Sequence, residues 1–123
     1  MISFEQFFME DGSPIYLQIV QYVKRGIVAG TVTDGDELPS RRMLSARLGV
    51  NPNTVQKAYR MLEEEGLIQS HSGAKSCVAV TTEAVTRVRA ELLAEETQGL
   101  ILAMKQMGVT KEEALGLMER FWN

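Results

Sequence analysis

Apolar side chains recur every three or four positions along most of this 123-residue chain, which is the spacing of amphipathic helices. The clearest stripe predicts a helix of about four turns, with Ser13 as its cap and Pro14 in its first position, ending near Gly30. Its apolar members lie four residues apart: Ile15, Ile19, Val23 and Ile27. This helix is expected to bury one face against the rest of the fold.

Two more helices are predicted close together. The first follows its cap, Ser40, and stops at Gly49, and the second starts at Asn51–Pro52 and ends near Gly66. Only one residue separates Gly49 from the next start signal, so the pair forms a helix-turn-helix. The side chains expected to face inward on the first of the two helices are Met43, Leu44 and Leu48.

Short β-prone segments follow at Leu67–Ile68 and Val78–Val80, on either side of a polar loop that contains Gly73. A two-stranded hairpin directly after a helix-turn-helix is a wing. The predicted fold class is mostly α with a small β-hairpin. A winged helix-turn-helix domain over residues 1–80 is followed by a short two-helix dimerisation domain over residues 81–123.

The tail is predicted to contain a helix that starts near Thr82 and is interrupted at Gly99, and a last helix opened by Thr110 with Glu113 in a capping-box spacing. Its apolar faces exceed what one small domain needs to cover, which favours a dimerisation surface over a ligand pocket. The residues assigned to that surface are Val88, Leu92, Leu100, Met104, Leu117, Phe121 and Trp122.

Charge is distributed unevenly along the chain, whose net charge is -3. Residues 38–62 contain no acidic side chain, whereas residues 1–37 carry six and residues 63–123 carry ten. The same window holds five basic residues: Arg41, Arg42, Arg47, Lys57 and Arg60. Local positive charge without carboxylates attracts a polyanion, so the helix-turn-helix is predicted to bind DNA.

The start of the second helix of the unit is the expected base-reading element, because this part of a recognition helix enters the major groove. Asn53 and Gln56 carry amides that can pair with adenine, Thr54 can reach a base or a thymine methyl, and Lys57 is placed in the same base-reading group. Asn51 alone is better explained as a cap.

Phosphate contacts are expected from Arg42, near the start of the preceding helix, whereas Arg41 and Arg47 fit a solvated surface equally well. Arg60 is expected to pair with Glu63 or Glu64. The predicted DNA-binding residues are Ser40, Arg41, Arg42, Asn51, Asn53, Thr54, Gln56, Lys57, Gly73 and Lys75.

Other chemistry has little support in the sequence. With one histidine, His71, and one cysteine, Cys77, the chain offers no catalytic triad, metal site or disulfide, and no cofactor is expected. His71 is interpreted as an exposed polar residue of the wing. Cys77 is interpreted as a small core residue under the wing rather than a redox sensor. No signal peptide and no membrane span are predicted, which favours a cytoplasmic location.

Four segments resemble the GntR family of bacterial transcription regulators. They are P-I-Y-x-Q-I at Pro14–Ile19, G-D-x-L-P-S-x-R at Gly35–Arg42, L-G-V-N-P-N-T-V-x-K-A-Y at Leu48–Tyr59 and L-E-x-E-G-L-I at Leu62–Ile68. The short two-helix tail is similar to that of the YtrA-type subfamily. The resemblance implies a homodimer on a palindromic operator, usually a repressor, often of its own operon and often beside genes for ABC transporters.

The resemblance also implies that operator DNA is contacted by Arg42, Asn53, Thr54, Lys57 and the wing tip at Gly73. The wing departs from the family pattern R-x-G-x-G-T-F-V, because Lys75 stands at the second glycine and Cys77 at the aromatic. Larger GntR subfamilies bind a metabolite or metal in a bulky C-terminal domain, and no such domain is expected here.

Two other functions stay open. A winged-helix module that binds a partner protein is the alternative from another class, and the acid-free window speaks against it. A small-molecule effector bound in the tail, of unknown identity, would add to DNA binding rather than replace it.

Overall fold

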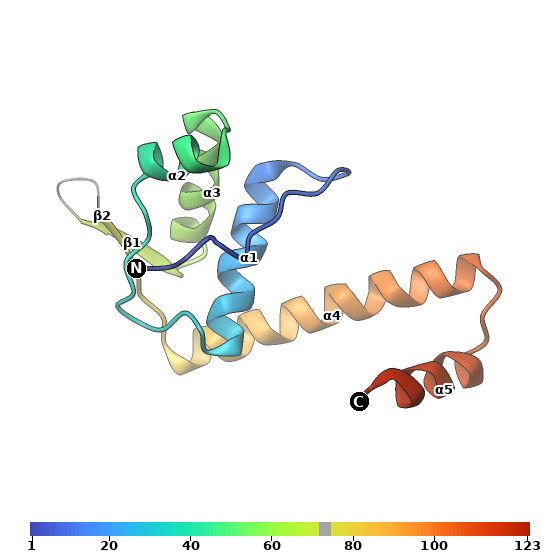
Figure 1. The fold of residues 1–123 in the computed structure, drawn as a ribbon. Coiled ribbons are helices and arrows are strands. Elements are labelled where there is room, and N and C mark those ends of the chain that lie inside the picture. Colours follow the sequence, from blue (N-terminus) through green and yellow to red (C-terminus); the bar gives the residue numbers. More distant parts are fainter. Residues whose placement is uncertain (72–74) are drawn as a thin grey trace. The chain divides into compact units, whose positions relative to one another are not determined.

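The computed structural model describes residues 1–71 and 75–123 and confirms a mostly helical chain with one antiparallel hairpin. It forms two compact units, residues 1–89 and 90–123, whose boundary falls within the fourth helix. The elements in chain order (Figure 1) are α1 (Ile15–Ala29), α2 (Arg41–Leu48), α3 (Pro52–Glu64), β1 (Ile68–His71), β2 (Lys75–Val78), α4 (Thr82–Gln106) and α5 (Lys111–Phe121).

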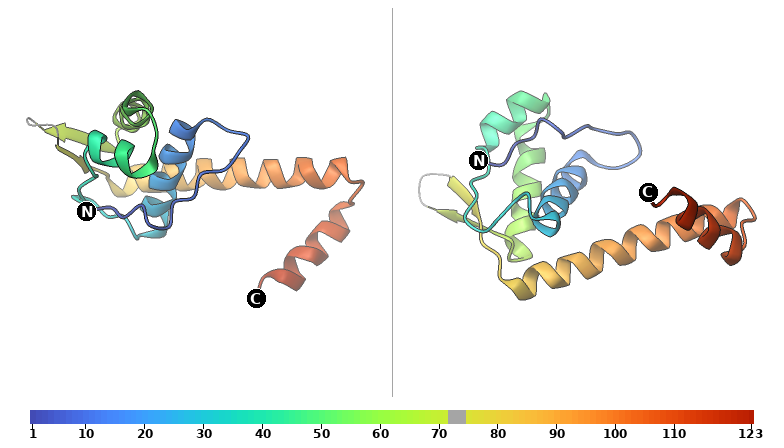
Figure 2. Two further views of the ribbon diagram at one scale, coloured as in Figure 1. Left: turned by 45° about the horizontal axis from the view of Figure 1, so that its top comes forward. Right: turned by 60° about the horizontal axis from the view of Figure 1, so that its bottom comes forward.

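The core of the first unit forms where α3 packs between α1 and α2, as the views in Figure 2 also show. Each helix contributes one apolar stripe and keeps its polar residues outside. The buried side chains are Ile19, Val20, Val23 and Ile27 of α1, Leu44 of α2, and Val55, Ala58, Tyr59 and Leu62 of α3. Three of the four residues predicted for the stripe of the first helix, Ile19, Val23 and Ile27, are therefore confirmed as core, whereas Ile15 is half-buried.

The turn between α2 and α3 is fixed by local hydrogen bonds. Gly49 adopts φ +69° and its N–H donates to the carbonyl of Ser45, as does the N–H of Val50. The Ser40 hydroxyl accepts from the N–H of Met43 at 3.1 Å, and Asn51 Oδ1 accepts from the N–H of Asn53 at 2.8 Å. Both predicted caps are confirmed, so the helix-turn-helix follows from local sequence rules.

The hairpin pairs β1 with β2, with Ser70 opposite Ser76. A preceding extended segment lies along β2, because the N–H of Leu38 donates to the Ser76 carbonyl at 2.8 Å and that of Val78 to the Asp36 carbonyl at 2.7 Å. β1 and β2 lie mostly within the polar stretch between the two predicted segments, and β2 ends at Val78 rather than at Val80. Ser76 and Val78 are buried, and Cys77 between them is only half-buried, so its assignment to the core was wrong.

Three helix details differ from the predictions. α1 begins at Ile15, and Ser13 is not its cap; the Ser13 carbonyl accepts instead from Gln18 Nε2 at 2.9 Å. Met43 is 55% exposed and does not face the core. α4 passes through Gly99 without a break, since one interior glycine costs only about 1 kcal/mol and the flanking residues favour helix.

Tyr59 is fully buried, and its hydroxyl donates to the Pro39 carbonyl at 2.6 Å. Burial raises the pKa of the Tyr59 phenol, against the opposing effect of the Arg41 charge, so the hydroxyl stays protonated. Tyr59→Phe is expected to lower the free energy of unfolding by about 1–3 kcal/mol, because a buried carbonyl loses its partner. Urea denaturation measures this change.

The matched control is Tyr22→Phe, which removes a hydrogen bond of similar length, 2.7 Å, to the Ser3 carbonyl from a half-buried ring. Its effect should be smaller, because water can replace the lost partner. Equal unfolding midpoints for the two variants would contradict the role assigned to Tyr59.

Candidate nucleic-acid interface

The first turns of α3 present polar side chains on the face opposite its core stripe. Asn53 and Lys57 are exposed and lie four residues apart, so they share this face, while Thr54 and Gln56 are half-buried at its sides. The cap bond to Asn51 joins Asn51 Oδ1 to the main-chain N–H of Asn53, which leaves the Asn53 amide side chain outside the cap. The structure thus brings the predicted base-reading residues together at the start of one helix.

Lys57 has a partner that the sequence did not indicate. Its ammonium lies 4.0 Å from the centre of the Tyr16 ring, which projects from α1. The contact holds a cation over an aromatic face while the lysine side chain stays exposed. Helical periodicity alone assigned Tyr16 no role. Its position in the P-I-Y-x-Q-I segment was the signal available.

Arg42 and Arg47 are exposed on α2, as is the cap Ser40 just before it. Their positions fit the phosphate contacts expected of the first helix of the unit, because guanidinium groups bind phosphate oxygens through paired hydrogen bonds. These cations lie at the surface of α2, which the turn at Gly49 joins to α3.

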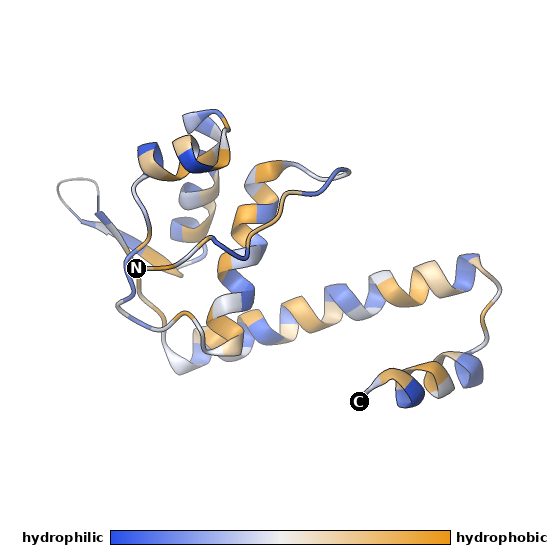
Figure 3. Ribbon diagram, in the orientation of Figure 1, coloured by the Kyte–Doolittle hydropathy of each residue, from blue (hydrophilic) through white to orange (hydrophobic). Residues whose placement is uncertain are grey.

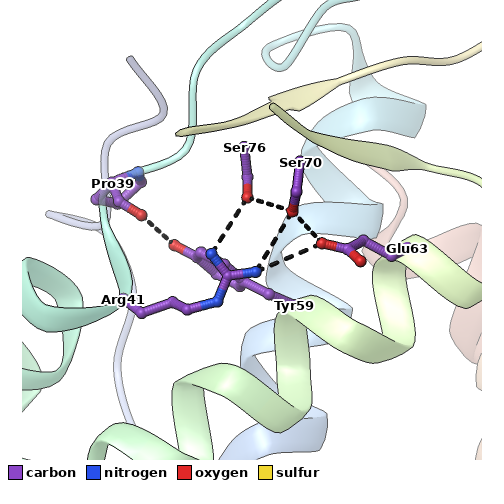
Figure 4. Close-up of polar contacts among 6 residues, drawn as sticks. All are labelled: Pro39, Arg41, Tyr59, Glu63, Ser70 and Ser76. Carbon is purple, nitrogen blue, oxygen red and sulfur yellow. Dashed lines mark hydrogen bonds and ion pairs between the residues drawn. The ribbon is translucent and has the colours of Figure 1, made fainter. Parts of the chain in front are cut away.

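The Arg41 side chain points toward Glu63 and the two hairpin serines (Figure 4). Its Nη2 lies 3.4 Å from Glu63 Oε1 and 3.5 Å from Ser70 Oγ, and its Nη1 lies 3.5 Å from Ser76 Oγ. Within the described residues Glu63 therefore bonds Arg41 and Ser70, and no ion pair joins Arg60 to Glu63 or Glu64, the two partners predicted for it. Arg41 faces the hairpin and not the outer surface of α2.

The wing carries one cation next to its tip. Lys75 Nζ lies 3.6 Å from Glu37 Oε1, but the lysine side chain remains 73% exposed, so the pair is loose. His71 is exposed and lies opposite Lys75 in the strand register. Gly73, the predicted tip residue, lies outside the described residues.

Carboxylates are kept to the far end of α3. Glu65 pairs with Lys24 at 2.7 Å, and its carbonyl accepts from Arg87 Nη2 at 3.2 Å. These contacts hold the end of α3 to α1 and to the start of α4. Glu63 and Glu65 thus pair with cations of α2 and α1, at a distance from the first turns of α3.

Apolar residues recur along α4 and α5 in the second unit (Figure 3), and many of their side chains are exposed. α5 contains no buried residue, and the capping bond from Thr110 to the N–H of Glu113 is confirmed. Between α5 and the last turns of α4 lies a groove of about 360 Å³. The residues that line it include Leu100, Met104, Val109, Leu115 and Met118.

The predicted dimerisation residues fall into two groups. Val88 and Leu92 are 1% and 8% exposed within the single chain, so their side chains are already covered. Leu100, Phe121 and Trp122 are 40%, 69% and 80% exposed. Met104 and Leu117 are half-buried.

Two other kinds of site are not found in the described part of the chain. It contains no group of three or more histidine, cysteine or carboxylate side chains placed to hold a metal ion. None of its helices is both long and apolar enough to cross a membrane.

Comparison with known proteins agrees with this geometry. Residues 15–78 match the family described as bacterial regulatory proteins, gntR family. The regulator YhcF of Bacillus subtilis is 34% identical over 91% of this chain and 93% of its own length. The HTH-type transcriptional repressor YtrA of the same organism is 34% identical over 82% of this chain and 78% of its own.

A solved structure gives the same result over nearly the whole chain. A GntR family transcriptional regulator from Listeria monocytogenes superposes with a TM-score of 0.78 at 33% identity, covering 91% of this chain and 98% of that one. The chain therefore belongs to the GntR family, whose members are helix-turn-helix transcription regulators and not enzymes.

Proposed function

We propose that this chain is a transcriptional repressor that binds a palindromic DNA operator as a homodimer. The observation that carries the DNA-binding part is the start of α3, where Asn53 and Lys57 are exposed on the face opposite the buried stripe. A recognition helix needs this division, because one face must hold it in the fold while the other enters the major groove.

The residues have different proposed roles. Asn53 and Gln56 read bases through their amides and Lys57 reads them through its ammonium, while Arg42 neutralises phosphates and carries no sequence information. Thr54, at the side of the helix, reaches a base or a thymine methyl. Two further residues, Ser40 and Asn51, place the N-termini of α2 and α3, whose free N–H groups favour phosphate oxygens.

Dimerisation is supported by the lack of any buried side chain on α5. An isolated helix of eleven residues is marginal in water, so its apolar side chains need a partner surface. A second copy of the chain supplies that surface, and a two-fold dimer places two recognition helices on half-sites about 34 Å apart. The proposed surface consists of Leu100, Met104, Leu117, Phe121 and Trp122.

Repression is supported by the similarity to YtrA, which is named as a repressor and aligns with 82% of this chain. A protein that occupies its operator tightly blocks access to the DNA it covers. The genes next to the chain's own gene are the first place to look for that operator.

The test is fluorescence anisotropy of the purified protein on DNA from its own upstream region and on a scrambled sequence, at several salt concentrations. We expect tight binding that prefers the native DNA and weakens steeply with salt, because phosphate contacts release counterions. Weak and equal binding to both sequences, or none at low salt, would contradict the proposal and favour a protein-interaction module.

A further inference from the structure

Arg41 connects three elements of the first unit through one side chain. It is the first residue of α2, and its guanidinium reaches Glu63 on α3, Ser70 on β1 and Ser76 on β2 (Figure 4). We infer, on the basis of the proposed DNA-binding function, that Arg41 is a positioning residue that fixes the wing against the helix-turn-helix and is not itself a phosphate ligand.

The guanidinium is enclosed rather than presented to solvent. The Arg41 side chain is 23% exposed, and its central carbon lies 5.1 Å from the centre of the buried Tyr59 ring. Its Nε is buried and has no hydrogen-bond partner within the described part of the chain. A cation placed to bind phosphate would keep its donors in solvent, whereas this one gives its terminal nitrogens to the protein.

The wing end of this network is a pair of facing hydroxyls. Ser70 and Ser76 are opposite each other in the strand register, and their oxygens lie 3.1 Å apart. Ser70 also donates to Glu63 Oε1. Arg41 and Glu63 therefore hold both strands at once, one from α2 and the other from α3.

The hairpin needs such a support, because each strand has only four residues and a two-stranded hairpin is marginal alone. Main-chain bonds to the Asp36–Leu38 segment hold the outer edge of β2. The Arg41 network holds its inner face. Lys75 directly precedes Ser76 in the chain, so the position of this wing cation depends on where Ser76 is held.

The charge balance agrees with this role. Glu63 lies 3.4 Å from Arg41 and offsets its charge locally, whereas Arg42 and Lys57 have no carboxylate within ion-pair distance in the described residues. Of the two adjacent arginines at the start of α2, Arg41 thus faces the wing, and Arg42 stays exposed to contact DNA.

A double-mutant cycle with Lys75 tests this role, with binding to the operator measured against salt concentration. Lys75→Ala should reduce the salt slope by about 0.9 per subunit, the value for one phosphate contact. Arg41→Ala should reduce it similarly through the displaced wing, and the double variant should lose no more than either single one. The control pair Arg42→Ala with Lys75→Ala should instead be additive, at about 1.8 per subunit.

Arg41→Lys separates the two roles further. Lysine keeps the positive charge but lacks the planar fork that reaches three partners, so we expect it to behave like Arg41→Ala. Recovery of the wild-type salt slope by Arg41→Lys, or additivity of Arg41→Ala with Lys75→Ala, would overturn the assignment and make Arg41 a phosphate ligand. An unchanged slope in Lys75→Ala would overturn the link from Arg41 to DNA through the wing.

A second readout needs no DNA. In the free protein, Arg41→Ala should speed hydrogen exchange at the N–H groups of Leu38 and Val78, which join the Asp36–Leu38 segment to β2. Arg42→Ala should leave exchange at both groups unchanged. Equal protection in the wild type and Arg41→Ala would overturn the inference. If the wild-type protein did not bind DNA, the proposed function would be contradicted. The exchange measurement would still decide the role of Arg41.

Ser70→Ala tests the same network in case the arginine variants misfold. It removes one hydroxyl from the hairpin and leaves Arg41, Glu63 and both helices intact. We expect faster exchange at Val78 and a salt slope that is not additive with Lys75→Ala. A Ser70→Ala protein that matched the wild type in both measurements would contradict a network that positions the wing.

Discussion

Phe121→Asp is expected to convert the dimer to a monomer and to weaken operator binding by at least about a hundredfold. The affinity falls because a two-fold dimer binds its second half-site at high effective concentration, an advantage of roughly 10²–10⁴ that a monomer lacks. Phe121 is 69% exposed in the single chain, so the substitution should leave the fold of each subunit intact. Sedimentation equilibrium measures the association state, and anisotropy measures the affinity.

Gln98→Asp is the matched control, since it adds the same charge at an exposed polar position of α4 outside the groove residues. It should remain a dimer and bind the operator normally. A Phe121→Asp protein that sediments as a dimer would show that α5 is not the dimerisation surface. Binding of single half-sites should be nearly equal in the wild type and the variant.

Asn53→Ala and Arg42→Ala are both expected to weaken DNA binding, the first through sequence preference and the second through phosphate contact. Asn53→Ala should lower the preference for the operator over scrambled DNA by about 1–3 kcal/mol, roughly 5- to 150-fold, with little change in salt slope. Arg42→Ala should lower the affinity for operator and scrambled DNA alike, and should reduce the salt slope by about 0.9 per subunit. Anisotropy at several salt concentrations separates the two signatures.

The cap of α3 makes the first of these comparisons clean. Asn51 Oδ1 bonds the main-chain N–H of residue 53, so alanine at that position keeps the cap. Arg42 is exposed on α2, and its removal should not change the urea midpoint. A similar loss of operator preference in both variants would contradict the division into base-reading and phosphate-binding residues.

The helix-turn-helix could be predicted from the sequence because its boundaries are local. Ser40, Gly49 and Asn51 act on N–H and carbonyl groups within a few residues, and each does in the structure what its type favours. The wing was harder, because β1 and β2 consist mostly of polar residues. Their pairing depends on main-chain bonds to a segment about forty residues earlier, near Asp36.

Part of the candidate site could not be read from the sequence for a similar reason. Arg41 and Arg42 are adjacent and chemically identical, and periodicity alone does not say which one faces the wing. The partners that decide this, Glu63, Ser70 and Ser76, come 22 to 35 residues later. The window of five basic residues was correct as a charge pattern, but it could not show that Glu63 already offsets one of them.

The exposure of Trp122 gives the protein an optical reporter of its own. It is the chain's one tryptophan and is 80% exposed beside the end of α5, so the indole emission of a single chain should resemble that of indole in water. Burial of that end of α5 by a partner would shift the emission to shorter wavelength. Dilution of unlabelled protein would then give the subunit dissociation constant without contribution from the DNA-binding unit.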